Sequence, residues 1–456
     1  MSKCYKLIKI TSFLILLSFT FIPMAFAVQD SESGIWSSFQ ESLSPRLDIN
    51  LRGAYYYKDS HFKPNDFHLS GNATAQFTRD LFKGIVLNVY PRVNFDTLYT
   101  KGTRLLVEDG EDRPAFTLYE AIFSWYGDSI EIEVGKKVYS WKVADGFSPV
   151  DIINPVDIIE LMDPEKIGVP SISILKIFEH ANIQMVFLPF FVPDRQPDDQ
   201  SRWTSDDPEG RAAFISRFGV APVNVDVGRA LPKDDFDKMA FASRISTSTL
   251  FTGWDLAFVY KYGYSTRGVI RNDINPFTLP LVLQTTEYPA YNLYGFSFST
   301  VSGDFEYHGE AAFHDTRDNV KDEDYISYIV GINYTNYDLF TNYFDEIRFV
   351  AEYAGEDIIK KRSAGSSFSD LGVSRGLTEN SIGSIEFKIN EDHSIKTSFI
   401  YNFANEDSML DMYVESQLND YLEIVYGYQR LSGDEASFLG QWDRNDRVFL
   451  RMSLKF

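Results

Sequence analysis

The sequence has almost no cysteine: Cys4 is the only one among 456 residues. Small secreted domains compensate for limited cores with disulfides, so this chain is not built on a disulfide framework. Basic residues are also in deficit, with 43 Lys and Arg against 65 Asp and Glu and a formal net charge of −22. Proteins that bind nucleic acid need basic surface to neutralise phosphate, so this balance argues against a nucleic-acid partner.

Long apolar runs are scarce as well. The run at residues 10–21 follows Lys3, Lys6 and Lys9 and precedes Ala25-Phe26-Ala27. A basic start, an apolar core and an A-x-A site are typical of a secretory signal peptide, which we expect at residues 1–27. Beyond it, no segment approaches the roughly 18 uninterrupted apolar residues of a membrane helix.

Aromatic residues are abundant instead, with 38 Phe and 27 Tyr, and Phe, Trp and Tyr together make up 16% of the chain. Many aromatics without a membrane helix are typical of a membrane β-barrel, whose two rims carry aromatic girdles. After the signal peptide, the apolar residues of 28–44 recur at helical spacing. We therefore expect a short amphipathic N-terminal helix there.

The final stretch, residues 447–456, alternates between apolar and polar residues. Val448, Leu450 and Met452 are apolar, and Arg451 stands between them. Since strand side chains alternate faces, this stretch has one apolar and one largely polar face. A chain that stops on Phe456 after such a strand resembles the closing strand of bacterial outer-membrane β-barrels, in which the last Phe belongs to the assembly signal. The alternative is an edge strand of a soluble sheet.

The same alternation recurs in segments of about ten residues, which is the signature of transmembrane strands. We therefore expect an all-β fold over residues 45–456, a transmembrane antiparallel β-barrel of about 18 strands (16–18). The connections alternate between tight turns and long loops, as short periplasmic turns and longer outer loops do. Besides 447–456, the expected strands are 47–57, 67–77, 85–95, 115–126, 130–141, 171–178, 182–189, 239–251, 254–262, 291–299, 305–314, 325–334, 347–353, 381–389, 394–401, 409–418 and 421–430.

The long connection 143–170 is the most individual one. Asn154 can cap a short helix that has Pro155 in its first position. Ile158, Ile159, Leu161 and Met162 would give that helix a broad apolar surface. Four apolar residues in an exposed loop need something to pack on, so we expect this loop to fold back into the lumen as a constriction.

Around this loop stand Val134-Gly135-Lys136-Lys137, Trp141, Asn154-Pro155-Val156-Asp157 and a Phe-Leu-Pro-Phe-Phe-Val-Pro run at 187–193. A glycine-led strand ending near Trp, an Asn-Pro-x-Asp loop and an F-x-P-x-F-x-P-like run resemble a porin-like family of Gram-negative outer-membrane proteins of unknown function. The architecture is also distantly similar to that of alginate-export porins. The resemblance implies an outer-membrane barrel without implying a substrate.

Pore loops are selectivity elements in this fold class, so the candidate site combines this loop with the inner wall. Acidic loop residues can favour cations or polar solutes, although they also serve as turn and helix-start residues. The constriction candidates are Trp141, Asp145, Asp151, Asn154 and Asp157. The lumen-wall candidates are Arg52, Arg92, Glu306, His308, Glu310 and Arg451, and Phe456 is the candidate assembly signal.

Histidines and carboxylates share one face of 305–314, a combination that can bind a metal. Polar residues are the default in a wet lumen, however, so we expect neither a metal nor another cofactor. The predicted function is an outer-membrane channel for small polar or charged solutes. Its expected partners are outer-membrane lipid, lipopolysaccharide and the barrel-assembly machinery.

Two alternatives stay open. One is a transporter or exporter of hydrophobic or polymeric substrates, which the apolar stretches 158–162 and 187–192 favour mildly. The other is an outer-membrane lipid-active enzyme. Six histidines leave few candidate bases, so we expect no enzyme.

Overall fold

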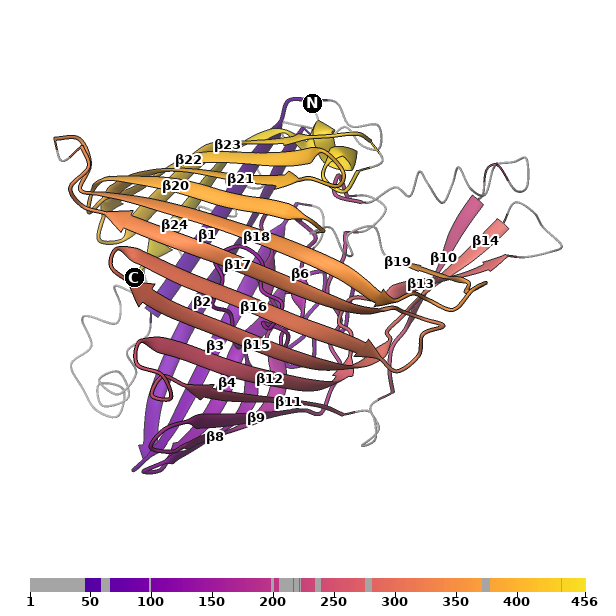
Figure 1. Ribbon diagram of the computed structural model, residues 1–456, viewed down its shortest axis with the longest axis horizontal. Helices are drawn as coiled ribbons and strands as arrows, with labels where there is room; N and C mark the ends of the chain where they lie inside the picture. Colours follow the sequence, from indigo (N-terminus) through magenta and orange to yellow (C-terminus); the bar gives the residue numbers. More distant parts are fainter. Residues whose placement is uncertain are drawn as a thin grey trace, which may run out of the picture.

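The computed structural model describes residues 46–58, 66–97, 100–197, 201–204, 216, 221, 223–233, 239–274, 281–340, 342–370, 378–435 and 437–456. Eighteen of the strands form one sheet (Figure 1). They are β1 (Arg46–Tyr56), β2 (Phe67–Phe82), β3 (Ile85–Asp96), β4 (Phe116–Tyr126), β5 (Ile130–Lys137), β8 (Val169–Ile177), β9 (Asn182–Leu188), β11 (Ala240–Thr247), β12 (Trp254–Tyr264), β15 (Ala290–Ser302), β16 (Phe305–Thr316), β17 (Asp324–Asn336), β18 (Glu346–Lys360), β20 (Asn380–Asn390), β21 (His393–Asn402), β22 (Asp407–Asn419), β23 (Leu422–Ser432) and β24 (Arg447–Lys455).

The sheet closes on itself. Each of these strands pairs antiparallel with the next along the chain, and β1 pairs with β24 in a register that places Leu51 opposite Met452. Leu47 and Phe456 complete this seam by exchanging two backbone hydrogen bonds of 3.0 Å. Closure removes the free edges that an open sheet would present. The predicted 18-stranded antiparallel barrel is therefore confirmed, and every expected strand corresponds to one of these elements.

The two faces of the wall are opposite in character to those of a soluble barrel. On β24, the outward Val448 and Leu450 are 45% and 44% exposed, whereas the inward Arg447 is 1% exposed. Apolar side chains outside and polar ones inside suit a wall that contacts lipid. Exposed aromatic residues gather at both rims: Trp125, Phe178, Phe251, Trp254, Phe305 and Tyr421 near one, and Tyr55, Tyr57, Phe67, Tyr401 and Phe403 near the other.

In the described part of the chain, no helix has the length and apolar character to cross a membrane.

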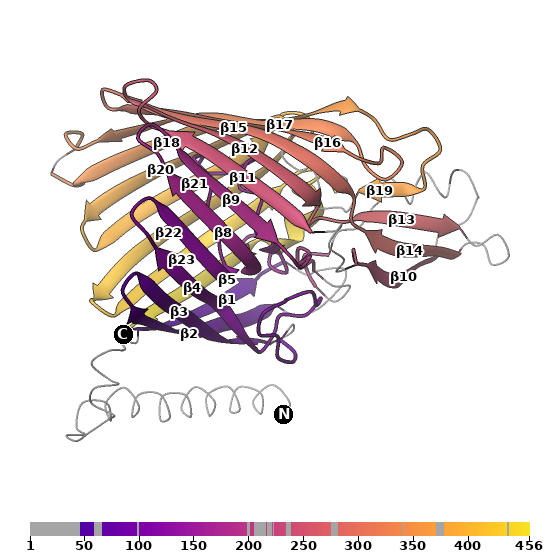
Figure 2. The same cartoon turned by 90° about the horizontal axis from the view of Figure 1, so that it is seen from below.

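Short and long connections lie at opposite ends, as predicted. The C-terminus lies at the end with the short turns, and a second sheet extends beyond the other end (Figures 1 and 2). This sheet has the order β10–β14–β13–β19, from β10 (Val223–Ala230), β13 (Val269–Ile274), β14 (Leu281–Glu287) and β19 (Phe368–Asp370). Its strands come from three different loops, so no local sequence pattern predicted it. A 3-10 helix, η2 (Gly440–Asn445), precedes β24.

The inserted loop (residues 138–168) begins earlier than expected. The predicted strand 130–141 stops at Lys137 because side chains take over the backbone donors that follow. The Val138 N–H donates to Glu120 at 2.7 Å, and the Tyr139 N–H donates to Asn154 at 2.6 Å. The chain therefore leaves the wall at this point and enters the lumen.

The predicted helix after Asn154 is wrong. Val156–Asp157 forms the short strand β6, which pairs with β7 (Glu165–Lys166), and the chain between them makes turns. Asn154 does not cap a helix, because its amide group bonds to backbone groups of Tyr139 and Ile167 in the loop and of Lys137 at the end of β5. The apolar residues do find the packing that they need. Ile158, Leu161 and Met162 lie against a cluster that includes Tyr56, Trp203, Val425, Trp442 and Phe449.

The inner wall is not uniformly polar as expected. Val186, Leu188, Val259 and Leu293 point inward on β9, β12 and β15, and all are buried in an apolar cluster. The inserted loop supplies the other half of that cluster, including Trp141, Val150 and Ile153. The loop thus explains why this part of the wall can be apolar on both faces. The predicted signal peptide (1–27) and N-terminal helix (28–44) lie outside the described residues.

A substitution of Gly135 tests whether the backbone conformation near the end of β5 is needed for the chain to enter this loop. Its φ of 142° belongs to the region that favours glycine, and an added Cβ would lie 1.9 Å from the Ala121 backbone oxygen. We expect Gly135→Ala to disrupt the pairing of β4 with β5 and to lower the folded yield sharply. The mobility of unheated samples in denaturing gels measures this yield. Gly53→Ala is the control, because its Cβ would meet only ordinary contacts at 3.8 Å.

Candidate constriction site

The neck of the inserted loop is held by Asn154. Its Oδ1 accepts the Tyr139 N–H at 2.6 Å, and its Nδ2 donates to the carbonyl oxygens of Lys137 (3.0 Å) and Ile167 (2.8 Å). Asp151 adds a second connection, since it accepts the Trp141 N–H at 3.1 Å and forms an ion pair with Lys166. Both side chains therefore hold the two ends of the loop together rather than facing open solvent.

Trp141 fixes the loop against the wall. It is 3% exposed within the apolar cluster, and its Nε1–H donates to Gln184 of β9 at 3.0 Å. This satisfies the one polar group of a large buried ring. Trp141 is consequently an anchor of the constriction and does not line its surface.

The tip of the loop rests on two wall carboxylates. Glu310 of β16 accepts the backbone N–H groups of Val143 (2.5 Å) and Ala144 (3.0 Å) and the hydroxyl of Ser148 (2.5 Å). Glu352 of β18 accepts the N–H groups of Asp145 (2.8 Å) and Gly146 (2.9 Å). Hydrogen bonds to an ionised acceptor are stronger than neutral ones, so these contacts hold the tip across the lumen.

The Asp145 side chain turns away from this contact. Its carboxylate accepts from Asn333 at 2.9 Å and pairs with Arg348 at 3.2 Å. It stays 42% exposed, more than any other carboxylate proposed for the constriction. Among those candidates, Asp145 is therefore the residue placed to meet a solute.

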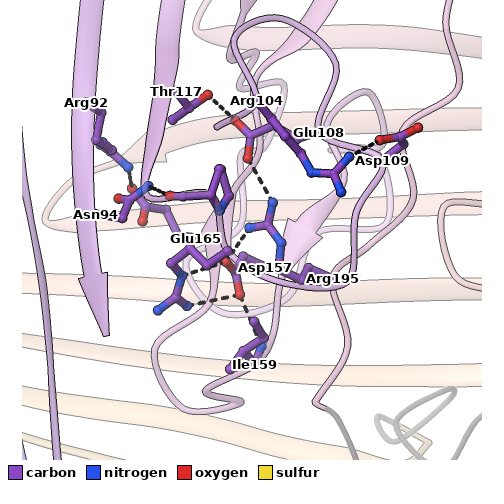
Figure 3. A network of polar contacts seen from close by, with 12 residues as sticks. Arg92, Asn94, Arg104, Glu108, Asp109, Thr117, Asp157, Ile159, Glu165 and Arg195 are labelled. Atoms are coloured by element: carbon purple, nitrogen blue, oxygen red, sulfur yellow. Dashed lines mark hydrogen bonds and ion pairs between the residues drawn. The ribbon is translucent and has the colours of Figure 1, made fainter. Parts of the chain in front are cut away.

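The base of the loop is fixed by Asp157, which is 4% exposed. Arg113 donates to it from Nε at 2.9 Å and from Nη2 at 3.1 Å, and Arg195 donates from Nη1 at 2.6 Å. Figure 3 shows that these contacts continue to Glu108, which accepts from Arg195 at 2.8 Å and from Thr117 at 2.7 Å. Lys136 of β5, fully buried, also pairs with Glu108 at 2.6 Å.

The network extends along the wall to β3, β2 and β24, which follow β4 in the order of paired strands. Arg113 pairs with Asp96 of β3 at 2.9 Å, and His68 of β2 bonds to Asp96 at 2.9 Å and to Glu160 at 3.1 Å. Arg447 of β24 bonds to Glu160 at 3.0 Å and to Asp163 at 2.8 Å. We call this chain of contacts the latch; its members are Asp96, Glu108, Arg113, Lys136, Asp157, Glu160, Asp163, Arg195, His68 and Arg447.

Electrostatics keep the loop carboxylates of the latch charged. Burial alone would raise the pKa of Asp157, but Arg113 and Arg195 outweigh it and lower that pKa to about 2. Burial likewise opposes ionisation of Glu160 and Glu108. Hydrogen bonding from His68 and the charge of Arg447 lower the pKa of Glu160, and the charges of Lys136 and Arg195 lower the pKa of Glu108. Asp157, Glu160 and Glu108 therefore stay ionised at neutral pH.

The predicted wall residues fall into two groups. Glu306, His308 and Glu310 lie on β16 beneath the loop tip. Arg92 pairs with Glu165 of the loop at 2.5 Å, and Arg451 pairs with Asp163 at 2.5 Å. Arg52 lines a small pocket with Glu160 and Asp163. Sequence analysis missed Glu352 and the latch residues Glu108, Arg113 and Arg195. The alternation of apolar and polar residues in 347–353 could have indicated that Glu352 points into the lumen. Residues in loops show no such alternation, so their positions could not be predicted in this way.

The chain is similar to several solved outer-membrane barrels. One is Wzi of Escherichia coli, described as a carbohydrate-binding β-barrel involved in group 1 capsule assembly, with 9% identity, a TM-score of 0.49 and coverage of 95% of this chain and 91% of that chain. Acinetobacter baumannii OccAB3 has 11% identity and a TM-score of 0.49, with 91% and 99% covered. A BenF-like porin from Pseudomonas fluorescens has 10% identity and a TM-score of 0.48, with 91% and 98% covered.

No protein-family model matches the chain, and no curated protein sequence matches it. The barrel class is thus established by the strand pairing. The resemblance to a family of unknown function and to alginate-export porins stays a prediction.

Asp157→Asn tests the latch. The substitution leaves two buried guanidinium groups without their shared carboxylate, so we expect unfolding free energy to fall by about 3–5 kcal/mol. Urea unfolding in lipid vesicles, followed by tryptophan fluorescence, measures the change. Asp112→Asn is the matched control: its pair with Lys101 is solvent-exposed, and we expect a loss of less than about 1 kcal/mol. Equal losses in the two variants would contradict the latch.

The pH dependence of stability gives a second test. A carboxyl with a lowered pKa in the folded state contributes stability above its ordinary pKa and loses it as pH falls through the folded value. For Asp157 these limits are 3.8 and about 2. We expect the stability difference between the wild type and Asp157→Asn to be constant from neutral pH to about pH 5 and to shrink towards pH 2. A difference that grows on acidification would contradict the assignment.

Proposed function

We propose that the protein is an outer-membrane channel for small polar or charged solutes, narrowed by the inserted loop. The observation that carries this proposal is the part of the inner wall that the loop leaves uncovered. Charged side chains point inward there while staying partly exposed, so they border water inside the barrel. They include Glu386 on β20, Lys396 on β21 and Glu415 on β22.

The outward face supports the proposed location. Its exposed apolar side chains and two aromatic rims match a barrel that spans a bilayer. Lipid and lipopolysaccharide are the proposed neighbours of these rims. Phe456 is 50% exposed and stacks on Tyr421 with ring centroids 6.0 Å apart, beside the seam. We keep it as the proposed signal for the assembly machinery, and export through the signal peptide as the route.

Two observations weigh against the alternatives. The apolar residues Ile158, Leu161 and Met162 pack against the barrel wall and neighbouring loops, so they do not line a path for hydrophobic cargo. The His308 side chain is fully buried and bonds to Glu352 at 2.8 Å, so it is not placed to act on a lipid. The proposed activity is therefore passage of solutes rather than catalysis.

Glu310→Gln tests whether the loop tip limits the passage. The substitution removes the charge that holds three loop donors, so we expect the tip to loosen and single-channel conductance in a planar bilayer to increase. Glu323→Gln, in an outer loop away from this contact, is the control. Correctly folded wild-type protein that never conducts, or a Glu310→Gln conductance equal to the wild-type value, would contradict the proposed constriction.

Asp145→Asn tests selectivity under a salt gradient. The exposed carboxylate of Asp145 attracts cations at the narrowed passage, so its removal should shift the reversal potential towards weaker cation preference. The measurement is the zero-current potential across a bilayer with unequal KCl on its two sides. An unchanged potential would exclude Asp145 as a determinant of selectivity.

A further inference from the structure

The contact between loop tip and wall gathers a histidine and two carboxylates. Asp145, His308 and Glu352 each offer one ligand atom, and these atoms lie within 4.8 Å of one another. His308 Nε2 lies 2.8 Å from Glu352 Oε1. We propose that these three side chains bind a divalent transition-metal ion. The proposal does not rest on the channel activity, although the site shares Asp145 with the proposed selectivity determinant.

Gly331 makes the cluster sterically possible. His308 on β16 and Glu352 on β18 are separated by β17, and both pair in register with Gly331. A Cβ at Gly331 would lie 2.3 Å from His308 Nε2 and 2.7 Å from Glu352 Cγ. The missing side chain therefore leaves the space in which the imidazole and the carboxylate meet above the middle strand.

The charge around this space favours a cation. Glu310 and Glu352 are 3% and 4% exposed, and both lie under the tip close to Asp145. In the described part of the chain, the one ion pair within 4.0 Å between these three carboxylates and an arginine or lysine joins Asp145 to the partly exposed Arg348. Arg244 also interacts electrostatically with Glu310. The loop N–H groups satisfy the hydrogen bonding of Glu310 and Glu352 but bring no positive charge. The cluster therefore keeps a negative charge that a divalent ion would neutralise.

Asn333 is an independent indication. It is 6% exposed, and its Nδ2 donates to Asp145 at 2.9 Å and to Glu306 at 3.3 Å. Its Oδ1 is buried and has no hydrogen-bond partner. Unpaired buried oxygens are rare because they cost free energy. The amide that carries this unpaired oxygen contacts the Asp145 carboxylate of the cluster through its Nδ2.

The donor types indicate the class of ion. One imidazole with two carboxylates suits Zn²⁺, Mn²⁺, Fe²⁺ or Co²⁺, whereas Ca²⁺ and Mg²⁺ favour sites made entirely of oxygen. Coordination through Nε2 requires that nitrogen to be deprotonated, so any ring proton must reside on Nδ1. His308 Nδ1 is buried without a partner. We therefore expect weaker binding than at a site whose histidine is supported by a second acceptor.

Sequence analysis pointed to this strand but to different companions and expected no metal. His314 stacks on Tyr325, with ring centroids 4.1 Å apart, and is not in the cluster. Of the two carboxylates that join His308 in the cluster, Asp145 comes from the inserted loop and Glu352 from β18. This combination depends on the folding of the loop across the lumen.

Co²⁺ titration of refolded protein in detergent tests the site. Saturable binding of one Co²⁺ with visible d–d absorption is expected, together with displacement by Zn²⁺ and retention in excess Ca²⁺. Asp145→Asn should weaken binding by about tenfold or more, and His308→Gln should remove the histidine-dependent absorption. His180→Gln, at an exposed turn, is the matched control and should bind like the wild type.

Asp145→Asn changes an exposed side chain, so it keeps the test informative even if His308→Gln fails to fold; gel mobility of unheated samples reports folding. Absence of saturable binding, wild-type affinity in Asp145→Asn, or displacement by Ca²⁺ would overturn the proposal. Loss of binding in His180→Gln would also overturn it. None of these results depends on conductance, so failure of the metal site and failure of the channel are distinguishable.

Discussion

Backbone hydrogen bonding is the constraint on which the rest of this structure depends. Lipid offers no partner to an N–H or C=O group, so a membrane-crossing sheet must satisfy all of its own backbone groups and leave no edge. Pairing of β1 with β24 achieves this closure. Closure of as many as 18 strands has a second consequence: the interior is too wide for wall side chains to fill. Filling it requires chain from elsewhere, and the inserted loop supplies that chain.

Once the loop is inside, its polar groups need partners away from bulk water. The base of the loop meets this need with charge pairs, as Asp157 lies between Arg113 and Arg195. The tip uses the reverse arrangement, in which wall carboxylates accept backbone N–H groups of the loop. In both places a charged group is satisfied by several donors or acceptors, which is the condition for tolerating a buried charge. The apolar residues of the loop then pack where the wall is apolar.

The sequence predicted the wall much better than the lumen. In each wall strand, as in 447–456, the alternation of apolar and polar residues depends only on which side of that strand meets lipid. This two-residue period was therefore sufficient to identify all 18 barrel strands. The helix expected after Asn154 failed because tertiary contacts overrode a local signal: the Asn154 amide bonds to Tyr139, Lys137 and Ile167 instead of capping. Asp157 was singled out as a pore carboxylate, yet only the arrival of Arg113 and Arg195 from other loops shows that it is buried in a charge network. Contacts between residues of different loops produce no periodic pattern in the sequence.

The two ends of the inserted loop differ in how firmly they are held. At the base, Asp157 is contacted by two guanidinium groups and is almost fully buried, so opening would separate opposite charges in a low-dielectric setting. At the tip, the wall carboxylates bond mainly to backbone N–H groups, and the Asp145–Arg348 pair is half exposed. Exposed ion pairs contribute little, whereas separating buried ones is costly. Motion that changes the width of the passage is therefore expected at residues 145–148, while the neck at Asn154 and the latch keep the rest of the loop in place.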